Sequence, residues 1–247
     1  MADRIQKTLA HAGFGSRREI EAAIAAGRVR VNDKTAELGA SLAAGDRVAI
    51  DGCFVNWEKR IDVPCRVLAY KKHVDQVVTR SDPEGRATVF RKLPRLEGGR
   101  WLAVGRLDVN TSGLLLMTTD GELKRRLEHP SYALARTYAV RIHGRVDQAM
   151  IDRLVAGVEL EDGVAHFESV RVADDENKAN RWFEVIVRQG RNRVVRRLWA
   201  SQGVTVSRLI RTGFGPVPLP GGVKAGSYYE LSRKEVKALA AVVDLKR

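Results

Sequence analysis

The sequence lacks long apolar runs. Nothing in its 247 residues approaches the roughly 20 consecutive apolar residues that a membrane-spanning helix needs. The first residues carry no apolar segment of the signal-peptide type, so we expect a cytoplasmic protein. Hydrophobic residues make up 44% and charged residues 30%, a balance typical of folded globular chains and not of disordered ones. This length predicts one or two domains.

Cysteine and histidine are also scarce. The two cysteines, Cys53 and Cys65, are too few for a disulfide framework or a four-ligand zinc site. The five histidines are scattered singly, and none has a second histidine at metal-ligand spacing. The sequence therefore predicts a protein without a metal centre.

Acidic residues are outnumbered. The chain has 43 Lys and Arg against 30 Asp and Glu, a net charge of +13. Such an excess indicates a polyanionic partner, and nucleic acid is the commonest one. An anionic membrane surface is the alternative, but it usually requires a basic amphipathic helix or a lipid anchor, and the sequence shows neither.

The first 60 residues read as a small unit of two helices followed by short strands. A first helix is expected around residues 3–11, and Ser16-Arg17-Arg18-Glu19 matches a capping box that opens a second helix ending at Gly27. Strand-like runs follow at 28–31 and 46–50, with a turn at Asn32-Asp33 between them. Each arginine of this unit, taken alone, is explained by a solvated helix face.

Strand-like runs dominate after residue 60. They are separated by helical patches that do not alternate regularly with them, which favours an α+β fold with a mixed, largely antiparallel sheet over a doubly wound parallel one. The expected strands are 67–70, 101–104, 114–117, 138–142 and 183–187, and the expected helices are 122–128, 146–154 and 192–202.

A polar turn between two apolar strands carries an arginine and an aspartate. It reads Gly105-Arg106-Leu107-Asp108 and runs through Thr111-Ser112-Gly113 into the next strand. Rigid scaffolds place reactive groups on loops of this kind. Asp108 can be a nucleophile, a general base or a turn-capping residue, and composition alone favours the cap.

An arginine-rich stretch follows near the end of the second unit. Residues 188–211 contain seven arginines and no acid. On a helix opening near Asn192, Arg193 and Arg197 share one face, while Val194, Val195 and Leu198 turn inward. One guanidinium group can bind two phosphate oxygens at once. Contact with nucleic acid is therefore favoured over a helix face that only meets solvent.

These segments resemble known families. The stretches Ala12-Gly13-Phe14-Gly15-Ser16-Arg17-Arg18 and Gly27-Arg28-Val29-Arg30-Val31-Asn32 are similar to the two signature stretches of the S-four RNA-binding domain. The Asp108 loop, Arg136-Thr137-Tyr138 and Gly190-Arg191-Asn192-Arg193 with the following Val-Arg-Arg resemble the three motifs of RNA pseudouridine synthases. The likeness runs from about residue 4 to 233 and is greatest to the rRNA-modifying RsuA/RluB branch. It implies an RNA-binding domain at 1–60 and a catalytic domain at 61–247.

The resemblance implies a cofactor-free isomerase. The reaction breaks a glycosidic bond, turns the freed uracil and rejoins it through ring carbon 5, with no net redox change. Asp108 matches the catalytic aspartate, Tyr138 the tyrosine that stacks on the base, and Arg196 the basic residue that pairs with the aspartate. Val195 matches the small apolar residue beside the tyrosine, and Arg106 is placed to fill the position of the flipped uridine.

The resemblance also implies partners. The family likeness is nearest to members that modify 23S rRNA, while 16S rRNA and a non-catalytic rRNA-binding assembly factor are the alternatives. Two positions depart from the family pattern, Val194 in place of a polar residue and Arg136 in place of lysine. We expect a monomer acting on ribosomal RNA or an assembling subunit, through the arginines Arg17, Arg18, Arg28, Arg30, Arg191, Arg193 and Arg197.

Overall fold

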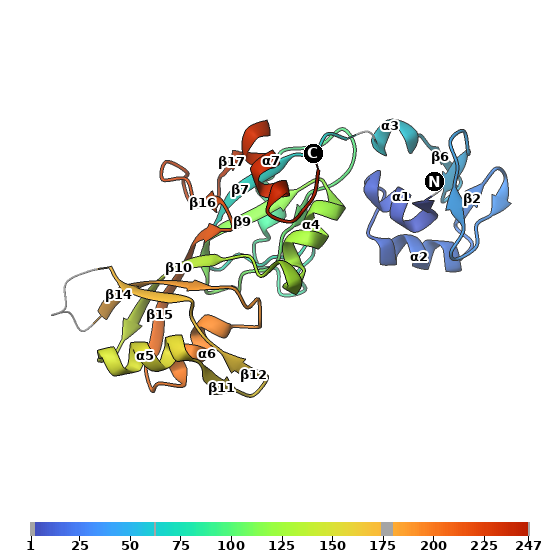
Figure 1. Cartoon of the computed structure of the whole chain (residues 1–247). Coiled ribbons are helices and arrows are strands. Elements are labelled where there is room, and N and C mark those ends of the chain that lie inside the picture. Colours follow the sequence, from blue (N-terminus) through green and yellow to red (C-terminus); the bar gives the residue numbers. More distant parts are fainter. Residues whose placement is uncertain (1–2, 62, 174–179, 247) are drawn as a thin grey trace. The chain divides into compact units, whose positions relative to one another are not determined.

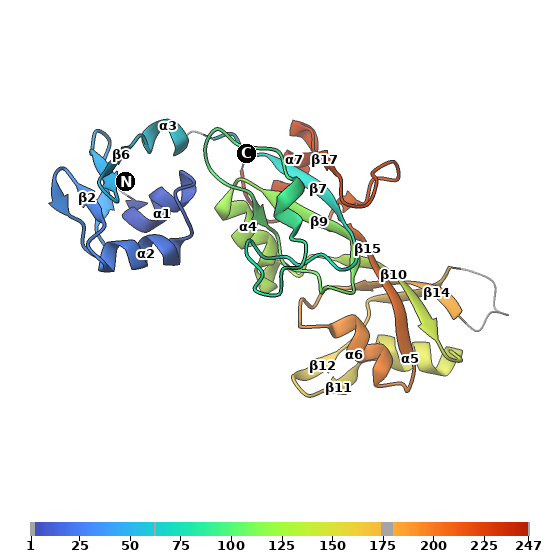
Figure 2. The ribbon, with the colours of Figure 1, turned by 180° about the vertical axis from the view of Figure 1, so that it is seen from behind.

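The computed structural model describes residues 3–61, 63–173 and 180–246, and these fall into two compact units (Figures 1 and 2). The first unit contains Cys65 and the described residues before it, together with Pro94–Leu102 and Thr119–Gly121. The second contains Arg66–Leu93, Ala103–Thr118 and the described residues from Glu122 onward. Among the described residues, no helix has the length and apolar character to cross a membrane.

The first unit has three helices and a small sheet. Its helices are α1 (Ile5–His11), α2 (Arg17–Ala25) and the short α3 (Glu58–Ile61), and the sheet order is β3 (Lys34–Thr35), β2 (Val29–Val31), β5 (Val48–Ile50) and β6 (Cys53–Val55). The pair β1 (Asp3–Arg4) and β4 (Ser41–Leu42) lies apart from it. Buried Ile5, Leu9, Ile20, Ile24 and Val48 form the core between helices and sheet.

Local signals set the ends of these elements. The Ser16 hydroxyl accepts from the Glu19 amide, and the Glu19 carboxylate accepts from the Ser16 amide, so the predicted capping box is confirmed. Asn32 and Asp33 both have positive φ angles, 48° and 62°, in the predicted turn between β2 and β3. Two such residues in succession form the tight hairpin turn that suits the twist of paired strands.

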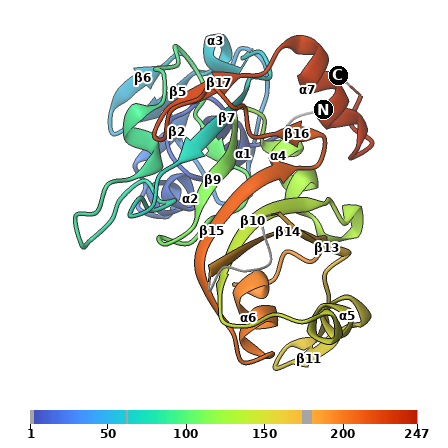
Figure 3. The same ribbon diagram turned by 90° about the vertical axis from the view of Figure 1, so that its left-hand side faces the viewer.

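A long sheet runs through the second unit. Its order is β13 (Ser169–Val172), β14 (Asn180–Val187), β10 (Arg136–His143), β15 (Thr205–Phe214), β9 (Ser112–Thr118), β7 (Val67–Lys72) and β17 (Tyr228–Glu230), with β16 (Val217–Pro218) beside β15. Neighbours in this order pair antiparallel apart from β9 and β15, which pair in parallel. In Figure 3, β15 curves between β9 and β10. The predicted α+β fold with a mixed, largely antiparallel sheet is confirmed.

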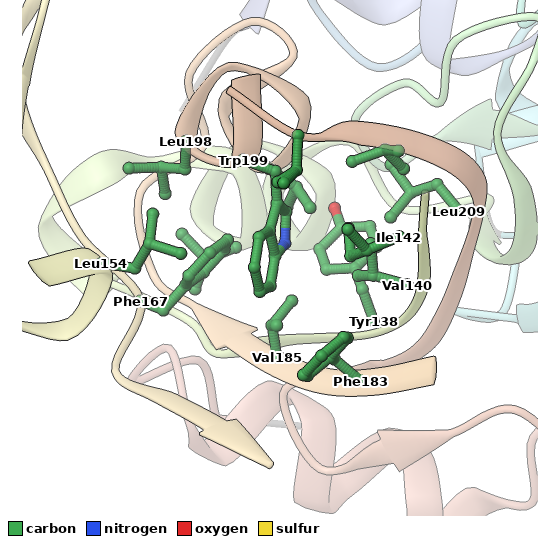
Figure 4. Packing of buried hydrophobic residues seen from close by; sticks show 14 of the residues in the cluster. Tyr138, Val140, Ile142, Leu154, Phe167, Phe183, Val185, Leu198, Trp199 and Leu209 are labelled. Carbon is green, nitrogen blue, oxygen red and sulfur yellow. The ribbon is translucent and has the colours of Figure 1, made fainter. Parts of the chain in front are cut away.

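Helices cover one face of the strands β14, β10 and β15. These are α5 (Gln148–Ala156) and α6 (Val194–Ala200), accompanied by the hairpin β11 (Val158–Leu160) and β12 (Gly163–Ala165). The cluster between them and the sheet is centred on Phe167, Phe183 and Trp199 (Figure 4). The remaining elements are β8 (Leu102–Ala103), α4 (Gly121–Glu128), α7 (Arg233–Ala241) and two 3₁₀ turns, Val89–Lys92 and Pro130–Tyr132.

Two predicted elements are shorter than expected. The strand expected at 101–104 is only β8, and the helix expected at 192–202 is only α6. Arg193 has a left-handed backbone with φ of 49°. A residue in this conformation cannot continue a right-handed helix, so α6 begins after it. The prediction that Arg193 and Arg197 share a helix face is therefore wrong.

Candidate active site

The loop that carries Asp108 is tied to a buried lysine. Lys72 is fully buried at the end of β7, in register with Gly113 of β9. Its ammonium donates to the carbonyl oxygens of Asp108 at 2.9 Å and Thr111 at 2.8 Å, and it also reaches those of His73 and Val109. Burial lowers the pKa of Lys72 from 10.5 to about 8, against the opposing charges of Asp108 and Asp75.

Two arginines bind the same loop and the strand that follows it, one from α6 and one from β15. Arg196 of α6 donates to the carbonyl oxygen of Asn110 at 3.0 Å and to that of Val206 at 3.0 Å. Arg211 of β15 is 2% exposed, donates through Nε to the Leu114 carbonyl at 2.7 Å and lies 5.2 Å from the ring centroid of Phe214. We call Lys72, Arg196 and Arg211 the loop cradle, because all three donate to carbonyls of residues 108–114.

The carboxylate of Asp108 is about one third exposed and pairs with Arg193, whose Nη1 lies 3.6 Å from Oδ2. Arg193, whose left-handed backbone sets the start of α6, is thus the residue that pairs with Asp108. The sequence predicted Arg196 as the partner of Asp108. In the structure the Arg196 guanidinium instead donates to main-chain carbonyls. Burial and the charge of Arg193 lower the pKa of Arg196, while the charge of Asp108 raises it, so Asp108 and Arg196 still interact electrostatically.

Tyr138 lies in one row with the loop. It is in register with Arg211, which is in register with Gly113 on the neighbouring strand β9. Tyr138 is 9% exposed and belongs to the buried cluster of Figure 4, as does Val195, the residue predicted to accompany it. Tyr138 is therefore separated from β9, the strand that leaves the Asp108 loop, by the single strand β15.

Gly113 makes this close row possible. A Cβ atom at this position would lie 2.2 Å from the carbonyl oxygen of Arg211, and the backbone φ is +102°. For both reasons, any residue other than glycine at position 113 would distort the backbone. At the opposite end of the loop, the amide of Gly105 donates to the Glu128 carboxylate at 2.6 Å, and the neighbouring Arg106 side chain is exposed. The predicted role of Arg106 in base flipping stays a prediction.

The arginines predicted to bind RNA differ in their surroundings. Arg17 and Arg18 are exposed on the first turn of α2. Arg28 makes two hydrogen bonds to Asp51, at 2.8 and 3.0 Å, and Arg30 donates to the Asp33 carbonyl.

Asp162, in the turn of the hairpin β11–β12, binds two of the arginines near α6. Arg197 donates to both of its carboxylate oxygens, at 2.8 and 2.9 Å, and Arg191 lies 3.5 Å away while donating to the Gly163 carbonyl. The hydrogen bond from Arg197 is the main reason that the pKa of Asp162 lies below its usual value. Residues 188–211 contain no acid, but in the folded chain Asp162 supplies a negative charge to two of their arginines.

Sequence reasoning missed Lys72 and Arg211. A signal existed for both, because strand alternation gives Lys72 the same side as Leu68 and Tyr70, and Arg211 the same side as Leu209. A cation at an inward position of an apolar strand indicates a buried partner. Within residues 3–61, 63–173 and 180–246, no three His, Cys, Asp or Glu side chains gather as metal ligands.

Two family models match this chain, each in a different part of it. The model of the RNA pseudouridylate synthase family matches residues 66–201, and the model of the S4 domain matches residues 3–48. The chain is 51% identical over 247 residues to "Ribosomal large subunit pseudouridine synthase B" of Escherichia coli O6:H1, covering 99% of this chain and 84% of that protein. It is 52% identical to the protein of the same name from Haemophilus influenzae, covering 98% of this chain and 68% of the relative.

A solved structure shares the fold. A crystal structure of a pseudouridylate synthase superposes with a TM-score of 0.68 at 23% identity, covering 96% of this chain and 99% of that one.

Proposed function

This chain belongs to the RNA pseudouridylate synthase family, and on that premise we propose that it converts a uridine of 23S ribosomal RNA to pseudouridine, with Asp108 as the catalytic aspartate. The family and the predicted enzyme class, an isomerase, follow from the matches over the whole chain. The choice of large-subunit rRNA rests on relatives about half identical in sequence that carry that substrate in their names.

The observation that carries the role of Asp108 is the way its loop is held. A solvent-accessible carboxylate sits on a main chain whose carbonyls are bound by three cationic side chains. A turn-capping aspartate needs no such arrangement, whereas a reacting group must be held within a fraction of an ångström of its productive position.

The reaction breaks the bond between the ribose C1′ and uracil N1 and forms a bond from C1′ to C5. The proton on C5 then leaves and N1 takes up a proton, so the product is an isomer of the substrate. Asp108 is the group that attacks or deprotonates at the sugar, and Arg193 and Arg196 supply positive charge around the carboxylate. We assign Tyr138 to stacking on the uracil and Val195, which belongs to the same buried cluster, to supporting the tyrosine. Breaking and forming these bonds requires no external reductant or nucleotide.

The basic residues would hold the RNA. Exposed Arg17 and Arg18 of the S4 domain contact phosphate groups, as do the arginines around α6 once RNA competes with Asp162. We propose a monomer without a nucleotide cofactor, acting in the cytoplasm on rRNA or a pre-ribosomal particle, with its RNA-binding domain at residues 1–60.

Asp108→Asn tests the mechanism. Asparagine keeps the shape and any capping hydrogen bond but supplies no carboxylate. We expect single-turnover pseudouridine formation on a bound 23S rRNA fragment to be abolished, with RNA affinity and thermal stability close to wild type. Asp75→Asn is the matched control, because it removes a second carboxylate whose charge acts on Lys72, while the bond of Asp75 to the loop is made by its backbone amide to the Val109 carbonyl.

Turnover of Asp108→Asn within about tenfold of wild type, a barrier change of only about 1.4 kcal/mol, removes Asp108 from the mechanism. The substrate is tested by mapping pseudouridines in both rRNAs from cells with and without the protein. Loss of a 16S site instead of a 23S site contradicts the proposed substrate, and no change in either rRNA contradicts the proposed activity.

A further inference from the structure

The strands β14, β10 and β15 have a second face. Val140, Phe183 and Leu209 point toward α5 and α6, so the residues that alternate with them point away from these helices. On that side, Trp182 is in register with Arg141, and Arg141 is in register with Arg208. We call Trp182, Arg141 and Arg208 the outer row. Tyr138 lies on the helix-covered face, so the outer row is separate from the candidate active site.

The outer row places two arginines directly opposite each other. Residues that face each other across antiparallel strands have Cβ atoms only about 5 Å apart, and like charges at such positions destabilise the sheet. Arg208 is exposed and Arg141 is half-buried, so both guanidinium groups are at the surface of the sheet. A pair of like charges that lowers the stability of the sheet is expected where the two charges bind a ligand.

The Arg141 side chain is held in place. Its Nε donates to the hydroxyl of Ser207 at 3.0 Å, and its guanidinium carbon lies 5.9 Å from the ring centroid of Trp182. The pairing register of β10 and β15 shifts between Arg141 and Ile142, which is the irregularity that brings Ser207 beside Arg141. Bulges of this type redirect side chains at binding sites.

The next row along the same face is different. There Arg171 of β13 is opposite Glu184 of β14, so a positive charge faces a negative one, and Glu184 in turn is in register with Ala139 of β10. One face thus has a charge-matched row and, two residues along β14, a row with two positive charges. Among the described residues of these two rows, the excess positive charge is local to Arg141 and Arg208.

We propose that the outer row is an additional RNA-binding site, at which Arg141 and Arg208 hold one backbone phosphate and Trp182 contacts the adjoining nucleotide. Two guanidinium groups a few ångströms apart complement a phosphate, which neutralises the repulsion between them. An indole beside them offers a surface on which an unpaired base can stack. This inference rests on the proposed function, since it takes the bound polyanion to be the substrate RNA.

The position of the row suits a single RNA that also reaches Asp108. Arg141 is two residues from the end of β10, and Arg208 is three residues after the start of β15. The row is therefore at one end of these strands, where an RNA can pass from one face of the sheet to the other. The contact would add affinity and orientation without touching the reacting bond.

The test is Arg208→Gln, with Arg171→Gln as the matched control on the same face. We expect Arg208→Gln to raise the Kd for a 23S rRNA fragment about tenfold and to reduce the slope of log Kd against log salt by about one, because one phosphate contact is lost. Arg171→Gln should change neither quantity by more than about twofold. Arg208→Lys keeps the charge and should recover most of the affinity and the full salt slope.

Two further measurements distinguish an RNA-binding role of Arg208 from a structural one. Without RNA, the Tm of Arg208→Gln should equal or exceed that of wild type, because a repulsion is removed, whereas a structural arginine would lower it. Turnover at saturating RNA should be that of wild type. Equal Kd and salt slope for Arg208→Gln and Arg171→Gln overturn the inference, even if wild type forms pseudouridine. A wild type that binds RNA but forms no pseudouridine contradicts the proposed function and leaves the binding comparison intact.

Discussion

Replacing Lys72 with methionine tests whether the loop cradle serves the reaction or only the fold. Methionine fills a similar volume but cannot donate, so the carbonyl oxygens of Asp108 and Thr111 lose donors at 2.9 and 2.8 Å. We expect turnover on a saturating rRNA fragment to fall about 100-fold, because displacement of a reacting group by about 1 Å has an effect of that size.

The expected change in stability is smaller than the number of lost bonds suggests. Loss of the two hydrogen bonds from the buried ammonium costs about 1–3 kcal/mol each, although the Asp108 carbonyl keeps the Thr111 amide as a donor at 3.0 Å. Against this, the lowering of the Lys72 pKa from 10.5 to about 8 means that burying the charge costs about 3 kcal/mol, a cost that methionine does not carry. The two effects largely cancel, so the free energy of unfolding should change by less than about 3 kcal/mol.

The assay compares single-turnover rates and urea unfolding of Lys72→Met with those of Lys71→Met. Lys71 is the neighbouring residue of β7 and is only partly buried, so its substitution removes the same charge without the donors to the Asp108 loop. A Lys72→Met rate within threefold of wild type, or a loss equal to that of Lys71→Met, would refute the reasoning.

Stability should also depend on pH through Lys72. Its pKa is lower in the folded state, so between about pH 8 and 10.5 the unfolded state binds more protons, and unfolding becomes less favourable as pH rises. The cost of burying the charge is fully present below about pH 8 and decreases as pH rises from about 8 to 10.5. The difference in unfolding free energy between wild type and Lys72→Met should therefore shift in favour of wild type from pH 7 to pH 10, and an unchanged difference would show that the lysine is not buried as described.

Two other substitutions probe the surroundings of the site. Gly113→Ala places a Cβ atom 2.2 Å from the Arg211 carbonyl oxygen and should destabilise the fold by more than about 3 kcal/mol in urea unfolding, whereas Gly105→Ala, with a positive φ but open space, should cost about 1 kcal/mol. Equal losses would contradict the close approach of β9 and β15. Asp162→Asn releases the arginines that the hairpin β11–β12 binds, so RNA affinity at low salt should rise about threefold with a steeper salt dependence. An unchanged salt slope would show that these arginines do not meet RNA.

Local patterns predicted much of the architecture. The capping box at Ser16 and the apolar runs of β7, β9, β10 and β14 depend on residues close together in the chain, and their elements were predicted to within a few residues. The partner of Asp108 could not be predicted in this way, because it depends on the left-handed backbone of Arg193. The ion pair between Asp162 and Arg197 likewise forms because the hairpin folds against α6. A contact of this kind cannot be predicted from the periodicity of the sequence.

The parallel contact between β9 and β15 has a consequence for newly made chains. Ser112 and Gly113 pair with Ile210 and Arg211, so the two halves of the sheet are joined by segments far apart in sequence. Asp108 leaves the ribosome long before Arg196 and Arg211, the residues that fix its loop from the far half. A growing chain therefore carries the carboxylate without the geometry that makes it useful. An enzyme whose proposed substrate is rRNA thus remains inert during most of its own translation.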